Sequence, residues 1–133
     1  MAYCALANGG LLMKPVIGDE VPKVVRRVCS ERTANLVKDA LQATPEEPMT
    51  PASQARSMVV GGKTGTALAI NSEGGYLPDQ IWTMFVGFFP VKDPEYVITV
   101  VVDDADLTPD KNYGGLVAAP IFSEIAEKIL KSK

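Results

Sequence analysis

A glycine-rich segment near the middle of the chain holds the residues whose types and spacing suggest chemistry. Residues 61–67 read GGKTGTA. The pair Lys63 and Thr64 invites comparison with a phosphate-binding loop, but that motif needs a glycine five positions before Gly62, where Ser57 stands. Residues 58–60 also run straight into the segment as an aliphatic stretch, without a loop to wrap phosphates. The segment therefore does not fit a P-loop.

The same residues make chemical sense as a β-strand. The two-residue period of a strand places Thr64 and Thr66 on one face, where two hydroxyls and nearby backbone N–H groups can hold a carboxylate or a developing oxyanion. Gly65 between them lets a ligand or a second backbone approach closely, and Lys63 adds a positive charge. The alternative is an edge strand, loosened by glycines, with two solvent-facing threonines. This segment alone does not decide between the two.

Other candidate chemistry is sparse. The chain has no histidine, which removes the usual general base of serine and cysteine hydrolases and most transition-metal sites. Cys4 and Cys29 are far apart in sequence and are expected to be small buried hydrophobic residues, not a redox pair. Asp103, Asp104 and Asp106 are more typical of a solvated turn than of a divalent-metal site. We expect no metal and no cofactor.

Composition limits the function classes further. The 133 residues suffice for one domain, and 47% hydrophobic with 22% charged residues argues against disorder. The net charge is -3 and the basic residues are scattered, so we expect no nucleic-acid partner. The longest apolar stretch, residues 82–91, is about half of the ~20 residues that a membrane helix requires. No basic region precedes the apolar start, so no signal peptide is predicted.

The first half of the chain predicts two helices and a small hairpin. Residues 1–8 favour a helix that Gly9 and Gly10 end, and residues 11–17 and 24–29 favour short paired strands. Ser30 is placed to cap a helix over residues 31–42. Three prolines then predict an extended loop over residues 43–57.

The second half predicts an antiparallel meander of strands at residues 58–68, 81–89 and 96–102, followed by a helix that begins near Pro120 and packs on the sheet. The fold class is therefore α+β. Residues 97–102 read VITVVV and lack polar alternation, so this strand should be central and covered on both faces. Yet the chain offers it only one obvious neighbour.

Four segments in order resemble class B penicillin-binding proteins, the D,D-transpeptidases of peptidoglycan synthesis. Residues 63–67 resemble the KTG motif, and the other three matching segments are YCALANGG at residues 3–10, WTMFVGFFP at 82–90 and YGGLVAAPIF at 113–122. The resemblance covers nearly the whole chain. It implies a partial β-lactamase/transpeptidase-like fold, with a three-stranded antiparallel sheet and a C-terminal helix packed on it.

The resemblance implies specific roles for four residues. Lys63 would support the site electrostatically, and Thr64 would bind the carboxylate of the substrate or β-lactam. Thr66 would bind the same carboxylate through its hydroxyl and supply one oxyanion-hole N–H. Gly65 would keep the strand open to the ligand.

Two family motifs are missing. The acylating serine of the family lies in S-x-x-K and a second serine lies in S-x-N, but no serine in this sequence is followed at those spacings by lysine or asparagine. We therefore expect residues 1–133 to be the C-terminal portion of a transpeptidase domain, inactive alone. Relatives also often carry Gly-Thr where this chain has Met49 and Thr50, which leaves the KTG assignment intact.

The resemblance also sets expectations for partners and location. Together with the upstream half, the partners would be the peptidoglycan stem peptide and β-lactams. The parent would lie at the bacterial inner membrane, with this domain on the periplasmic or extracytoplasmic side. The unpaired edge at residues 97–102 predicts self-association of the isolated chain. Two other hypotheses remain: a non-catalytic module that binds a peptide along residues 61–68 by strand addition, and a phosphate-binding protein.

Overall fold

A computed structural model describes residues 1–43, 60–105, 108 and 111–132, and it confirms the α+β class. The elements in chain order are α1 (Ala2–Ala7), β1 (Leu11–Met13), β2 (Val24–Arg27), α2 (Glu31–Ala43), β3 (Gly61–Ile70), β4 (Tyr76–Phe89), β5 (Tyr96–Asp103) and α3 (Ala118–Lys131). The predicted proline-rich loop lies outside the described residues from residue 44 onward.

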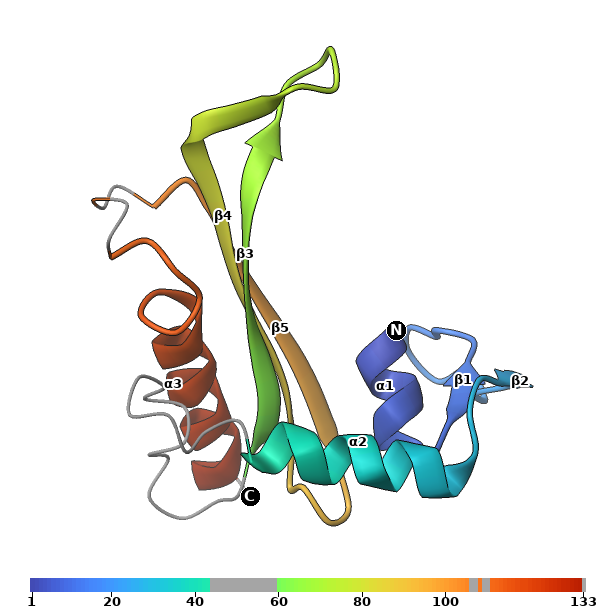
Figure 1. The fold of residues 1–133 in the computed structure, drawn as a ribbon. Helices are drawn as coiled ribbons and strands as arrows, with labels where there is room; N and C mark the ends of the chain where they lie inside the picture. The colour runs from blue at the N-terminus through green and yellow to red at the C-terminus, as the bar shows by residue number, and fades with distance from the viewer. Residues whose placement is uncertain (44–59, 106–107, 109–110, 133) are drawn as a thin grey trace.

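The main sheet is the predicted antiparallel meander, in the order β3-β4-β5. Helix α3 covers one face of this sheet, and β3 and β4 extend together beyond the end of β5 as a long hairpin (Figure 1). The tip of the hairpin is built on Asn71, whose side-chain oxygen accepts hydrogen bonds from the backbone N–H groups of Glu73 and Gly75 at 3.0 and 2.8 Å. Strand β4 therefore begins at Tyr76, five residues before its predicted start.

The core lies between the sheet and α3. Phe122 of α3 is fully buried, and its ring lies 4.8 Å from that of Phe85 in an edge-on arrangement. Gly87 lies beneath the same ring, because a Cβ at this position would come within 2.8 Å of it. The remaining buried members of this core are Val60, Phe89, Val100, Ala118, Ala119 and Ala126. The last helix thus packs on the sheet as predicted, with Phe122 and Ala126 fully buried, whereas Ile125 is 37% exposed.

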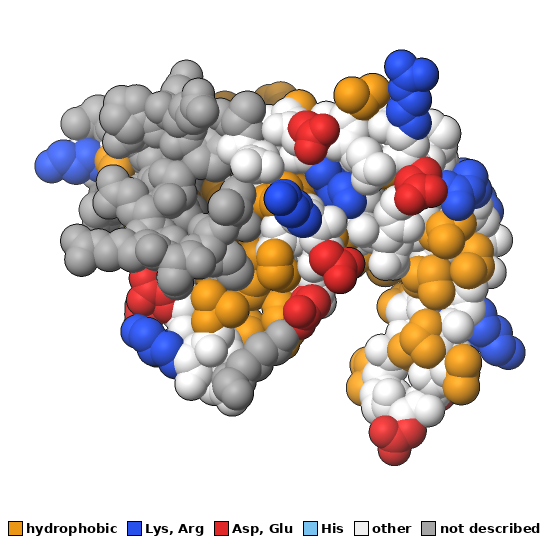
Figure 2. All heavy atoms as spheres, turned by 90° about the horizontal axis from the view of Figure 1, so that it is seen from below, with side chains coloured by type: hydrophobic (Ala, Val, Ile, Leu, Met, Phe, Trp, Pro, Cys, Tyr) orange, Lys and Arg blue, Asp and Glu red, His pale blue; other side chains and the backbone are white. Residues whose placement is uncertain are grey.

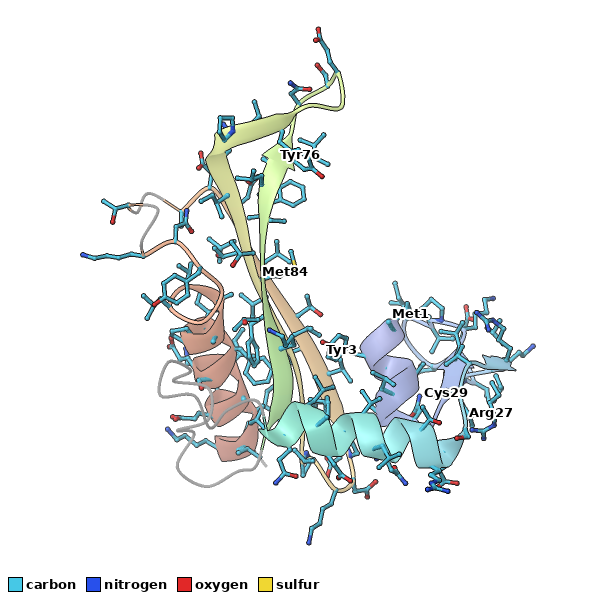
Figure 3. The ribbon with its side chains drawn as sticks, in the orientation of Figure 1. Met1, Tyr3, Arg27, Cys29, Tyr76 and Met84 are labelled. Carbon is cyan, nitrogen blue, oxygen red and sulfur yellow. The ribbon has the colours of Figure 1, made fainter. Side chains whose placement is uncertain are left out.

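The N-terminal helix and hairpin form a second unit beside the sheet. Helix α1 ends at Ala7 with Asn8 as its C-cap, and the predicted helix-ending residues Gly9 and Gly10 take the left-handed conformation with φ of 63° and 89°. Strands β1 and β2 pair antiparallel, as predicted. Tyr3 points from α1 toward the sheet (Figure 3), and partial burial raises the pKa of its hydroxyl.

Helix α2 begins at the predicted cap. The backbone N–H of Thr33 donates to the Ser30 hydroxyl at 3.0 Å, which satisfies one of the first-turn N–H groups. The helix runs along the lower end of the sheet in Figure 1 and contacts both α1 and β3. It therefore links the N-terminal unit to the strand that carries the KTG segment.

Among the described residues, β5 has the single neighbour that the sequence offers it, and neither the central position nor the cover on both faces expected from its composition is seen. The strand pairs only with β4 and lies at an edge of the sheet, not at its centre. Val100 faces α3 and is 9% exposed, whereas Val101 on the other face is 54% exposed. The reason is that α3 covers one face only, and no described strand continues the sheet beyond β5.

Candidate functional site

The four candidate residues lie together in β3, at the other edge of the sheet. Lys63, Thr64, Gly65 and Thr66 occupy consecutive positions opposite Val86, Phe85, Met84 and Thr83 of β4. Thr64 and Thr66 share the face covered by α3, as the two-residue period predicts, because Phe85 opposite Thr64 is packed on Phe122. Thr64 is half-buried and Thr66 is exposed.

The pairing of β4 fixes which backbone groups of β3 face the open edge, the edge beside which no described strand lies. The N–H of Asp104 donates to the carbonyl of Ile81 at 3.2 Å, so odd-numbered residues of β4 direct their backbone groups toward β5. Even-numbered residues of β4 then face β3, and their partners include Lys63 and Gly65. It follows that Thr64 and Thr66 direct their N–H and C=O groups away from the sheet.

Lys63 places its positive charge at this open edge. Its side chain starts on the opposite face of β3, yet the ammonium reaches the carbonyl and the hydroxyl oxygens of Thr64 at 3.3 and 3.4 Å. Both contacts are long, and the side chain is exposed, so an anionic ligand can replace them. A cation, two hydroxyls and two outward N–H groups within four residues form an arrangement suited to a carboxylate or an oxyanion.

Gly65 is closely packed against β4 and against the loop before α3. A Cβ at Gly65 would lie 2.6 Å from Cγ of Met84, and one at Gly114 would lie 2.8 Å from the carbonyl oxygen of Gly65. The loop before α3 therefore rests directly on the strand that carries the candidate residues. Sequence reasoning identified this loop only as a family match and did not connect Gly114 with Gly65.

Sequence reasoning also missed Thr83, which lies opposite Thr66 in β4. Its side chain is fully buried, and its hydroxyl has no hydrogen-bond partner among the described residues. Such a hydroxyl costs about 1–3 kcal/mol of stability relative to a satisfied one. The sequence signal was a single polar residue in the otherwise apolar stretch at residues 81–89.

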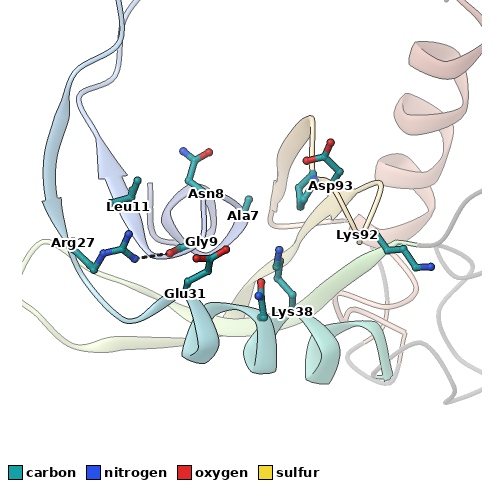
Figure 4. Close-up of a pocket in the computed structure, with 11 residues that line it drawn as sticks. Ala7, Asn8, Gly9, Leu11, Arg27, Glu31, Lys38, Lys92 and Asp93 are labelled. Atoms are coloured by element: carbon teal, nitrogen blue, oxygen red, sulfur yellow. Dashed lines mark hydrogen bonds between the residues drawn. The ribbon is translucent and has the colours of Figure 1, made fainter.

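A pocket of about 430 Å³ lies elsewhere, between α1, α2 and the turn after β4 (Figure 4). Its lining includes charged residues of both signs, namely Arg27, Glu31, Lys38, Lys92 and Asp93, but not Lys63, Thr64 or Thr66. Arg27 has a structural role here, since its guanidinium donates to the carbonyls of Gly9 and Cys29 at 2.8 and 3.2 Å. The pocket is thus separate from the candidate edge.

The other candidate residues named from the sequence, the cysteines and the aspartates, form no site in the part of the chain that the structure describes. Cys4 and Cys29 are free and half-buried. Asp103 and Asp104 are described but Asp106 is not, and within the described part of the chain no three potential ligands gather as a metal site. Lys and Arg side chains are scattered among acidic ones on the face shown in Figure 2. None of the described helices is long and apolar enough to span a membrane.

Comparison with known proteins gives consistent matches in sequence. The family model described as the penicillin binding protein transpeptidase domain matches residues 1–127. Stage V sporulation protein D of Bacillus subtilis is 34% identical over 137 residues, and a probable peptidoglycan D,D-transpeptidase, PbpC of Pseudomonas aeruginosa, is 32% identical over 136. These alignments cover 93% and 98% of this chain but only 21% and 23% of the relatives.

Solved structures agree with the sequence matches. The transpeptidase domain of penicillin-binding protein 3 from Burkholderia pseudomallei aligns with a TM-score of 0.78 and 32% identity. Penicillin-binding protein 3 of Mycobacterium tuberculosis, in a complex with ampicillin, aligns with a TM-score of 0.74 and 31% identity. Both alignments cover 98% of this chain, and they cover 40% and 33% of the respective structures.

Proposed function

The chain belongs to the penicillin-binding protein transpeptidase family, and we propose that it is the substrate-binding, C-terminal portion of a serine D,D-transpeptidase domain. The observation that carries the proposal is the outward direction of the Thr64 and Thr66 backbone at the free edge of β3, beside the Lys63 ammonium. This edge offers the donors that a peptide carboxylate and an oxyanion need.

Each group at the edge takes a distinct role in this proposal. The hydroxyls of Thr64 and Thr66 bind the terminal carboxylate of the stem peptide, or that of a β-lactam, and Lys63 supports the negative charge. The outward N–H of Thr66 stabilises the oxyanion that forms when a serine attacks the D-Ala-D-Ala carbonyl. Hydrogen bonds along the edge align the substrate main chain with β3, as in strand addition.

The acylating serine and its lysine come from outside this chain. No serine in the 133 residues has a lysine three positions later, and the chain spans about a fifth of the two curated relatives described above. We propose that a preceding segment supplies S-x-x-K and S-x-N. The serine then forms an acyl-enzyme with release of D-alanine, and an amine of a neighbouring stem peptide takes the acyl group.

Location and association follow from the same proposal. The domain of the full-length protein acts on the extracytoplasmic side of the bacterial inner membrane, where peptidoglycan is cross-linked. Without the preceding segment, the open edge of β5 favours self-association. A non-catalytic peptide-binding module would use the same β3 edge, but it would form no covalent adduct.

Covalent labelling of the full-length protein with fluorescent penicillin tests the proposal. We expect a labelled band after denaturing electrophoresis. Thr66→Val should slow acylation on the order of 10²-fold, about 3 kcal/mol, because it removes a donor to the bound anion while keeping a β-branched residue. Thr99→Val on β5 is the matched control, since Thr99 is also an exposed strand residue but lies away from β3. Absence of labelling in the folded full-length protein would overturn the proposal.

A further inference from the structure

We propose that Thr83 of β4 is a positioning residue for Thr66, which it orients toward the carboxylate of the ligand. The inference rests on the proposed function and adds a group that does not touch the substrate. Two independent observations support it: the place of Thr83 in the strand register and the state of its hydroxyl.

The register makes Thr66 and Thr83 close neighbours. They are directly opposite each other and their side chains share one face of the sheet. Because Thr83 directs its backbone groups toward β5, the pair with Thr66 is of the non-hydrogen-bonded kind, in which side chains approach most closely. Opposed threonines in such pairs are within reach of a hydroxyl-to-hydroxyl bond.

The hydroxyl of Thr83 is available for this bond. The side chain is fully buried, and the oxygen has no partner among the described residues. Thr66 is exposed, so its χ1 rotamer can change without disturbing the core. The polar group needed by the buried hydroxyl is therefore the side chain that lies across from it.

The direction of the hydrogen bond explains how Thr83 would act. If the Thr83 hydroxyl donates to the oxygen of Thr66, the hydrogen of Thr66 is free to point outward, toward a carboxylate oxygen at the edge. One rotamer of Thr66 is then favoured when the ligand binds. Thr83 thus holds the donor in place while the anion is bound, which strengthens binding and speeds acylation.

The test compares variants at both positions in the full-length protein. Second-order rate constants for acylation by fluorescent penicillin, and melting temperatures, are measured for wild type, Thr83→Val, Thr83→Ser, Thr66→Val and the double valine variant. Thr83→Val keeps the shape and removes the hydroxyl, and Thr83→Ser keeps the hydroxyl. Thr83→Ala is used in place of Thr83→Val if that variant does not fold.

We expect Thr83→Val to be acylated about tenfold more slowly, an effect within the range of interaction energies measured between neighbouring residues. Its melting temperature should be unchanged or higher, because the variant removes a buried hydroxyl that has no partner among the described residues. Thr83→Ser should remain close to wild type. In the Thr66→Val background, loss of the Thr83 hydroxyl should have no further effect, because Thr83 acts through Thr66.

Three results would overturn the inference: wild-type acylation by Thr83→Val, additive effects in the double variant, or equal slowing by serine and valine. If Thr83 were purely structural, its substitution would leave the acylation rate unchanged, whatever its effect on the melting temperature. Labelling of the wild-type protein by fluorescent penicillin shows whether one or both proposals have failed. If it is labelled and the Thr83 variants behave like it, only the positioning role fails; if it is not labelled, both fail.

Discussion

Gly114 lies against the backbone of Gly65, so the loop before α3 and the KTG strand touch without intervening side chains. A Cβ on Gly114 would lie 2.8 Å from the carbonyl oxygen and 3.2 Å from the nitrogen of Gly65, and it would collide with the carbonyl of Met84. The neighbours are backbone atoms of a paired ladder and cannot rotate away. A side chain at residue 114 must therefore displace either the loop or β3.

Gly114→Ala is the direct test of this contact. We expect it to destabilise the full-length protein by about 1–3 kcal/mol, the usual cost of overpacking. It should also slow penicillin acylation, because Thr64 and Thr66 flank the displaced strand position. Thermal unfolding and acylation rates measure the two effects.

Gly75→Ala is a suitable control for Gly114→Ala. Gly75 lies at the tip of the β3–β4 hairpin, and its added Cβ would meet only the side chain of Asn71, at 3.1 Å. We expect a small change in stability and none in acylation. Equal effects of the two substitutions would show that the Gly114 contact does not matter.

The isolated chain of 133 residues should not form a covalent adduct with fluorescent penicillin. No serine in the sequence has a lysine placed to deprotonate it, and no histidine is available as a substitute base. Denaturing electrophoresis beside the full-length protein makes the comparison. A labelled serine in the isolated chain, located by mass spectrometry, would show that the nucleophile does not lie in a preceding segment.

Ser30→Ala should lower the stability of α2 through loss of its cap. The Thr33 N–H loses its acceptor at 3.0 Å, and the expected cost is about 1 kcal/mol. Ser72→Ala, at the exposed hairpin tip, serves as the control. Chemical denaturation of the full-length protein gives both values, and equal midpoints for the two variants would contradict the capping role.

The features that were predictable from sequence are those that depend on near neighbours in the chain. The cap at Ser30, the glycines that end α1 and the alternation of Thr64 and Thr66 follow from local rules, and the structure confirms them. The contact of Gly114 with Gly65 joins residues 49 positions apart. No local pattern encodes such a contact.

Strand β5 illustrates the same limit. Its composition predicted burial on both faces, because an aliphatic run carries no information about which neighbours are present. The structure leaves Val101 exposed and one edge unpaired among the described residues. Similarly, the direction of the backbone groups of Thr64 and Thr66 could be read only from the pairing of β4.

The last prediction concerns self-association through β5. By the same alternation that applies to β4, Val97, Thr99, Val101 and Asp103 direct their backbone groups away from the sheet. An apolar edge with free backbone groups is a template for another strand. We therefore expect the isolated chain to dimerise or aggregate at micromolar concentration, as measured by light scattering.

Val101→Lys should weaken this association with little loss of stability, because the Val101 side chain is 54% exposed and a charge there opposes pairing of two apolar edges. Val100→Lys should instead unfold the chain, since Val100 lies in the core against α3. Ile70→Lys, at a 62% exposed position on the β3 hairpin, is the matched control and should leave association unchanged. Hydrogen exchange of the outward amides supplies the decisive comparison. If the amides of Val97, Thr99 and Val101 are strongly protected in a stable monomer, they must have found a partner within the same chain, and the open-edge interpretation of β5 would then be wrong.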